Sequence, residues 1–110
     1  MHIAFAQVWR GSRFTDDEAL WPALEAGGRT MLARQFDELE QQCGEDWLIL
    51  GRFTAADTYA LTFLRWAKRL EFEPSDYPRW LALAGRVLDR PAVHRALTRE
   101  GLTAEGFLTP

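Results

Sequence analysis

Residues 51–70, GRFTAADTYALTFLRWAKRL, constrain the fold most, because a helix-start signal is followed at once by a long apolar run. Thr54 can be the N-cap, its hydroxyl accepting a hydrogen bond from the backbone N–H of Asp57. The Asp57 carboxylate can reach back to the N–H of Thr54, which closes a capping box. A negative charge in the first turn also suits the helix dipole. The pattern predicts a helix that begins directly after Thr54.

This predicted helix is apolar on more than one face. Leu61, Leu64 and Trp66 lie off its main stripe, and a helix of this kind is normally buried on several sides. We therefore expect a central helix with the other elements packed around it. The main stripe at helical spacing comprises Ala56, Tyr59, Ala60, Phe63, Ala67 and Leu70.

Two helices are predicted before this segment. The first covers residues 1–9, has no N-cap and looks like the tail of a longer helix. The second runs from about Asp17 to about Gln42, with Thr15 or Asp16 as its cap. Pro22 is tolerable there only because it lies in the first turn or so. The apolar stripe of the second helix is Leu20, Leu24, Met31, Leu32, Phe36, Leu39 and Cys43.

Glycines and a short apolar run interrupt the helical pattern. Gly27 and Gly28 weaken the second helix, and they mark either a kink or a place where another helix comes very close. Residues 45–53 form a connector in which 47–50, WLIL, is an apolar plug. This run resembles a strand but has no partner strand elsewhere, so it is expected to be a packed loop.

Proline and glycine delimit two further helices. Residues 73–76 are a break, the fourth helix begins near Ser75 or Asp76, and Pro91 opens the fifth. Gly101 ends the fifth helix, and residues 102–110 are a tail in which Phe107 and Leu108 tuck back. Five helical segments without strands predict an all-α helical bundle that forms one domain over residues 1–110.

Composition excludes several classes of protein. The chain has 110 residues, of which 47% are apolar, so it has enough apolar side chains for a core. A net charge of −3 without a basic stripe argues against a nucleic-acid or anionic-membrane surface. The single Cys43 can form neither an internal disulfide nor a metal cluster, and it fits a reducing compartment. We expect a cytoplasmic protein, since no apolar run reaches transmembrane length and the N-terminus is not a signal peptide.

The ordered set of these signals resembles the C-terminal helical domain of glutathione S-transferases, and within them the bacterial beta-type group. The resemblance is carried by residues 2–10, 47–49, 53–57, 64–67 and 90–97, the last reading RPAVHRAL, and it spans nearly the whole chain. Leu50 and Gly51 depart from the family pattern, which has glycine followed by an acidic residue in the connector. No segment corresponds to the family's thioredoxin-like domain, which binds glutathione and supplies the activating Ser, Cys or Tyr.

The resemblance also implies site residues. Phe5, Trp9 and Trp66 match positions on the wall of the hydrophobic substrate pocket, although aromatic stripes at helical spacing also serve plain packing. His2 matches a histidine that helps to hold glutathione across the dimer, although a terminal histidine is usually exposed and idle. Thr54 and Asp57 are structural.

The function predicted from this resemblance is a glutathione S-transferase-like protein reduced to its substrate-binding and dimerisation domain. Such a chain is not expected to catalyse alone, because the activating group belongs to the thioredoxin-like domain. Glutathione is the implied co-substrate, with no tightly bound cofactor and no metal. The implied partners are a second copy of the chain and a separate thioredoxin-like domain. The alternatives are a non-catalytic helical interaction module and a fragment of a longer glutathione transferase.

Overall fold

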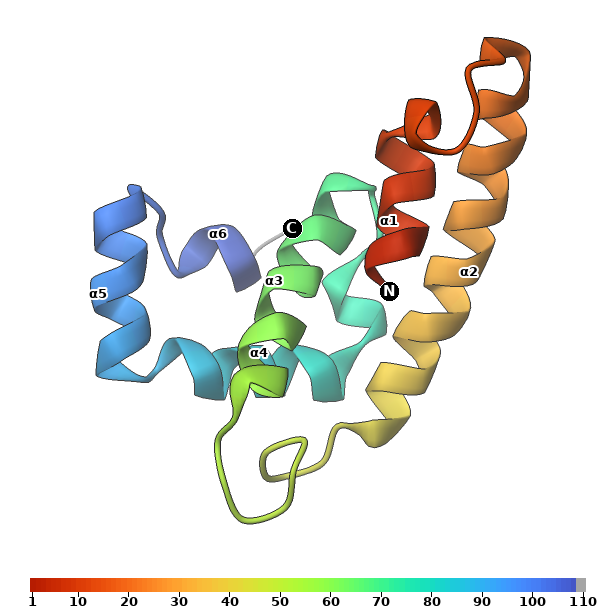
Figure 1. Ribbon diagram of the computed structural model, residues 1–110. Coiled ribbons are helices and arrows are strands. Elements are labelled where there is room, and N and C mark those ends of the chain that lie inside the picture. Colours follow the sequence, from red (N-terminus) through yellow and green to blue (C-terminus); the bar gives the residue numbers. More distant parts are fainter. Residues whose placement is uncertain (109–110) are drawn as a thin grey trace. The chain divides into compact units, whose positions relative to one another are not determined.

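The computed structural model describes residues 1–108, and all of the regular structure in this range is helical (Figure 1). The all-α prediction is confirmed, with six α-helices instead of about five, because the tail forms a short helix of its own. The helices are α1 (His2–Trp9), α2 (Trp21–Gln42), α3 (Ala55–Arg69), α4 (Pro78–Leu88), α5 (Pro91–Glu100) and α6 (Glu105–Leu108). Short 3-10 turns cover Gly11–Arg13, Glu18–Leu20 and Pro74–Asp76. None of the helices within residues 1–108 combines the length and apolar character that crossing a membrane requires.

The chain divides into two compact units, Met1–Glu38 and Leu39–Pro110, with the boundary inside α2. A single domain over residues 1–110 remains a prediction. In the tail, Phe107 is buried, as expected. The predicted position of the Leu108 side chain, like residues 109–110, lies outside what the structure describes.

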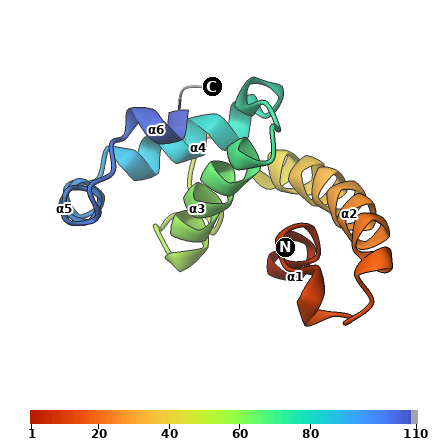
Figure 2. The ribbon, with the colours of Figure 1, turned by 90° about the horizontal axis from the view of Figure 1, so that it is seen from above.

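In the first unit, α1 lies against α2 at a glycine (Figure 2). A Cβ atom at Gly28 would come within 2.9 Å of both the Ala4 carbonyl oxygen and Cγ2 of Val8. At Gly27 a Cβ atom would meet nothing within 4 Å. Of the two readings of this glycine pair, a close helix approach therefore holds for Gly28. Only a residue without a side chain allows the backbones to come this near.

The second helix begins later than predicted. Asp17 caps the 3-10 turn Glu18–Leu20 instead, its carboxylate accepting a hydrogen bond from the N–H of Ala19 at 3.1 Å. The α-helix then begins at Trp21, which makes Pro22 its second residue. Proline lacks a backbone N–H, and inside a helix its ring clashes with the carbonyl four residues before it. It fits in the first turn of a helix, because the N–H groups there have no intrahelical partner. The helix therefore begins at Trp21, which keeps Pro22 within the first turn.

In the second unit, α3 packs against α4, and α6 contacts both (Figure 1). Trp80 of α4 is fully buried, and its indole N–H donates to the backbone carbonyl of Ala60 in α3 at 2.9 Å. Arg86, also on α4, donates from Nη2 to the carbonyl oxygens of Gly44 and Asp46 at 2.9 and 2.8 Å. Side chains of α4 thus bond both to α3 and to the loop that precedes α3.

The buried face of α3 differs from the predicted stripe. Leu61 and Leu64 are buried, whereas Ala56 and Tyr59 of the predicted stripe are exposed. The difference follows from the first turn: Asp57 is fully buried at 0% exposure, which turns the helix so that the positions three and four residues later face inward. The buried set is Asp57, Ala60, Leu61, Leu64 and Ala67.

The connector is a loop, as predicted, but only the first half of its apolar run, residues 47–50, is packed against the protein. Trp47 and Leu48 are half-buried, while Ile49 is exposed and Leu50 is 88% exposed. The chain reverses at Gly51, whose φ of 83° lies in the left-handed region. The Gly51 N–H donates to the Asp46 carboxylate at 3.0 Å and holds the pKa of Asp46 below its usual range. The run is therefore a tight turn with its apolar tip in solvent.

Candidate functional site

The aromatic residues of α1 form a stacked pair in the first unit. The rings of Phe5 and Trp9 lie 5.2 Å apart at an interplanar angle of 27°, and Phe5 also lies 5.9 Å from the ring of Phe36. Residues four apart on a helix face one another, which places this pair on one side of α1. Phe5 is 2% exposed and Trp9 is 43% exposed. Phe5 is therefore a core residue, and Trp9 is the member of the pair that meets solvent.

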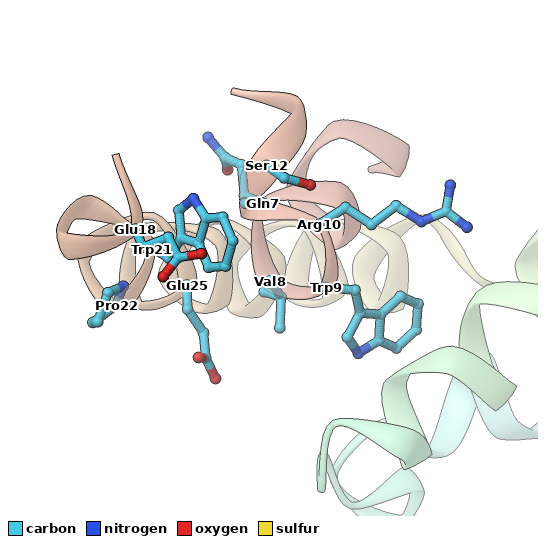
Figure 3. Close-up of a pocket in the computed structure, with 10 residues that line it drawn as sticks. Gln7, Val8, Trp9, Arg10, Ser12, Glu18, Trp21, Pro22 and Glu25 are labelled. Carbon is cyan, nitrogen blue, oxygen red and sulfur yellow. The ribbon is translucent and has the colours of Figure 1, made fainter. Parts of the chain in front are cut away.

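Trp9 borders a hollow of about 410 Å³ in the same unit (Figure 3). In Figure 3, Trp21 and Trp9 lie on opposite sides of Gln7 and Val8, and the lining side chains come from the end of α1, the start of α2 and the segment between them. Gly11 makes this geometry possible, because a Cβ atom there would lie 2.8 Å from the Trp21 ring. The Trp21 indole N–H donates to the carbonyl of Thr15 at 3.1 Å and so fixes the ring.

The polar groups around this hollow are of both signs. Arg10 and Glu18 line it, and so does Glu25, which is paired with Arg29 at 3.3 Å. The Gln7 side-chain oxygen is buried and has no hydrogen-bond partner among the described residues. A buried acceptor of this kind is costly unless a donor reaches it. The hollow therefore has a mixed lining, with aromatic rings beside side chains of both charges.

His2 is exposed at the start of α1 and borders a separate, smaller hollow of about 270 Å³. Ile3, Ala6, Arg13 and Phe14 complete its lining. The structure thus places His2 and Trp9 in different hollows of the first unit. The role of His2 toward glutathione stays a prediction.

Trp66 lies in the second unit, on α3, where it is half-buried. Its ring meets that of Phe63 edge-on at 5.6 Å, and Phe63 stacks on Tyr59 at 6.0 Å. These residues form an aromatic row along one side of the helix. Because Trp66 belongs to a different unit from Phe5 and Trp9, their shared pocket wall also stays a prediction.

Thr54 and Asp57 begin α3, with both halves of a capping box present. Asp57 Oδ2 accepts from the N–H of Thr54 at 2.8 Å, and the Thr54 hydroxyl accepts from the N–H of Ala56 at 3.2 Å. The second Asp57 oxygen accepts from the N–H of Leu48 at 2.9 Å. The carboxylate therefore joins the helix to the connector, a bond over nine positions that the local S/T-x-x-D spacing does not reveal.

Cys43 has the environment of a packing residue. The side chain is 2% exposed at the end of α2. Burial, and secondly the neighbouring Glu40 carboxylate, raise the pKa of its thiol to about 11. The thiol is thus protonated near neutral pH and is a poor nucleophile. Within residues 1–108, moreover, no group of three His, Cys, Asp or Glu side chains is placed to hold a metal ion.

Comparison with protein families decides the relationship. Residues 22–86, more than half of the chain, match the family described as glutathione S-transferase, C-terminal domain. This chain belongs to the glutathione S-transferase C-terminal domain family. The matched range contains α2 from its second residue on, all of α3 and most of α4, and so includes the capping box and Trp66.

One curated relative is the glutathione S-transferase GstA of Escherichia coli O157:H7. It is 40% identical over 58 residues, which are 53% of this chain and 29% of the relative. Most of the relative therefore lies outside the alignment. No solved structure matches the chain.

The family match includes Trp66, whereas His2, Phe5 and Trp9 lie outside the matched residues. The hollow around Trp9 also contains residues that the sequence did not indicate. Arg10 follows α1, Glu18 lies in a 3-10 turn and Trp21 opens α2, yet all three line this hollow. Gly11 is the one local signal, since a glycine between two helices indicates a tight turn there. Which side chains such a turn brings together depends on how α1 packs on α2 at Gly28.

Proposed function

We propose that this chain is the helical, substrate-binding domain of a bacterial, beta-type glutathione S-transferase and acts together with a thioredoxin-like domain that binds glutathione. The family match over residues 22–86 carries the proposal. The similarity to E. coli GstA supports it, since that protein is named a glutathione S-transferase.

The substrate side of the proposal rests on the aromatic residues. Trp9, half-exposed beside a hollow of about 410 Å³, presents the kind of flat apolar surface that binds an aromatic electrophile. Phe5 fixes the Trp9 ring by stacking, and Trp66 offers a second half-buried indole. We assign the hydrophobic pocket wall to these three residues, and a contact with glutathione to His2.

Activation of the glutathione thiol is assigned to the thioredoxin-like domain. A thiol becomes nucleophilic when a nearby donor or positive charge stabilises its thiolate. In this chain the functional positions implied by the family are aromatic side chains and one histidine, and the role assigned to them is binding. The chain alone is therefore not expected to accelerate conjugation.

The test is a two-step activity measurement. The purified chain is assayed for conjugation of glutathione to a nitroaromatic electrophile, and is then fused to the glutathione-binding domain of the E. coli relative and assayed again. We expect activity only from the fusion. In the fusion, Trp9→Ala and Trp66→Ala should raise KM for the electrophile while KM for glutathione stays within about twofold.

Ile49→Ala is the control, since Ile49 is similarly exposed at 47% but lies in the connector and lines neither the hollow beside Trp9 nor that beside His2. Conjugation by the chain alone that tracks the protein through purification would contradict the proposal. A fusion that folds and binds glutathione but stays inactive would favour the non-catalytic interaction module.

The proposed assembly is a cytoplasmic homodimer formed through α1 and the start of α2. Large apolar side chains are exposed on this part of the first unit, namely Ile3, Trp9, Phe14 and Leu20. Soluble monomers rarely leave contiguous apolar surface uncovered, and two-fold pairing is the commonest way to cover it.

A further inference from the structure

The second unit contains a hollow of its own, with a volume of about 500 Å³. Its walls come from α3, α5 and the C-terminal segment, whose arrangement can be followed in Figure 1. It shares no lining residue with the hollow beside Trp9. Both its size and its largely apolar lining are typical of small-molecule sites. The apolar side chains that line it include Leu61, Val93, Leu97, Leu102 and Phe107.

Two arginines, each held on an aromatic ring, line this hollow. The Arg90 guanidinium carbon lies 3.8 Å from the centre of the Phe53 ring, and that of Arg65 lies 5.6 Å from the centre of the Phe107 ring. Stacking uses the flat face of a guanidinium and leaves the N–H donors along its edge available. Both arginines are half-buried. The Phe53 ring thus positions the Arg90 guanidinium before any ligand binds, and the Arg65 guanidinium lies within cation–π range of the Phe107 ring.

Neither guanidinium has a carboxylate partner in the part of the chain that the structure describes. Thr58 and Thr62 also line the hollow, but their hydroxyls already donate to backbone carbonyls of α3 at 2.8 and 3.1 Å. Glu100 is the acidic residue among the lining residues, so two positive charges face one negative charge. The start of α5, which has no side-chain cap, adds partial positive charge.

We propose that this hollow binds an amphipathic carboxylate, with an aryl or alkyl body against the apolar walls and its carboxylate on Arg65 and Arg90. A guanidinium edge matches a carboxylate in geometry, and such charge-assisted bonds are stronger where water is partly excluded. This site is separate from the electrophile-binding wall proposed at Phe5, Trp9 and Trp66, and it does not depend on transferase activity.

The test is a titration of the whole ¹⁵N-labelled chain with 4-phenylbutyrate, followed by NMR, beside the same titration with 4-phenylbutanol. The two ligands share a body and differ in charge. We expect saturable shifts of backbone amides around Leu61, Val93 and Leu97, with the alcohol binding at least about tenfold more weakly, since the acid alone forms charge-assisted bonds. Equal binding of acid and alcohol, or shifts confined to residues 1–38, would overturn the proposal.

Substitutions test whether Arg65 and Arg90 bind the carboxylate of the ligand. Arg65→Gln and Arg90→Gln should each weaken binding of 4-phenylbutyrate about fivefold or more, and Glu100→Gln should tighten it by removing a like charge. Arg99→Gln is the matched control, because Arg99 is an exposed arginine on α5 that does not line the hollow. Should Arg90→Gln disturb the fold, Ala96→Phe fills the hollow without changing charge and should abolish binding. Unchanged affinity in Arg65→Gln and Ala96→Phe would refute the site.

Discussion

The buried Asp57 side chain connects the start of α3 to the loop before it. Its two carboxylate oxygens accept hydrogen bonds from the N–H groups of Thr54 and Leu48, at 2.8 and 2.9 Å, and the side chain is fully buried. A buried carboxylate is tolerated when donors surround it. One of these two bonds comes from Leu48 in the connector, so the Asp57 carboxylate does more than cap α3.

Asp57→Ala should lower the free energy of unfolding by about 3 kcal/mol, because two partly buried backbone N–H groups lose a charged acceptor. Asp57→Asn keeps the shape and one acceptor oxygen, but its NH₂ group faces one of the two backbone N–H groups. It should therefore lower the free energy of unfolding by less than Asp57→Ala. Urea unfolding followed by circular dichroism measures both.

Asp89→Ala is the control, since Asp89 is an exposed aspartate of the same unit with no structural bond of this kind. Its unfolding free energy should stay within about 0.5 kcal/mol of that of the unchanged chain. Equal effects of Asp57→Ala and Asp89→Ala would mean that the carboxylate has no special role.

At the scale of elements, α4 begins without a cap of its own. Pro78 opens it, Tyr77 offers no side-chain acceptor, and the next two N–H groups point at Glu40. The Glu40 carboxylate, at the end of α2, accepts from the N–H of Arg79 at 2.9 Å and from that of Trp80 at 2.8 Å. A negative charge at this end also suits the helix dipole. One helix thus caps another.

Glu40→Ala should therefore lower the free energy of unfolding by about 1–2 kcal/mol. Hydrogen exchange gives the specific readout, since the amides of Arg79 and Trp80 should exchange at least about tenfold faster while those in the middle of α3 change little. Gln41→Ala is the matched control, because Gln41 is the exposed neighbour in the same turn of α2. Uniformly faster exchange across the second unit would contradict local capping.

At the scale of the whole molecule, the proposed homodimer is the property to test. An obligate pairing of this kind should bury upward of about 2,000 Å² in total. Light scattering at micromolar concentration should give twice the chain mass of 12.6 kDa. Ile3→Glu should shift the chain to the monomer, because it places a charge on a side chain that is 67% exposed in the first unit.

Leu50→Glu controls for the mere addition of charge, since Leu50 is even more exposed but lies in the connector of the second unit. It should leave the mass unchanged. A monomer mass for the unchanged chain would contradict the dimer proposal. A monomer produced only by Leu50→Glu would indicate that the dimer interface lies at the connector.

By itself the sequence determined the fold class and most helix ends, because these depend on local chemistry. Pro91 and Gly101 begin and end α5, with Gly101 in the left-handed region at φ 67°, and Thr54 begins α3. Such signals act through backbone groups a few residues away, so they can be read without knowing the fold. The order of the signals also indicated the family.

Only the tertiary structure decided which faces are buried and which side chains meet. Asp57 sets the rotation of α3 through its bond to Leu48, and Gly28 lets α1 approach α2 closely enough to form the hollow beside Trp9. Arg65 on α3 and Arg90 at the N-cap of α5 come to one hollow, 25 positions apart in the sequence numbering. Contacts of this kind depend on packing between distant segments, on which helical periodicity and capping chemistry carry no information.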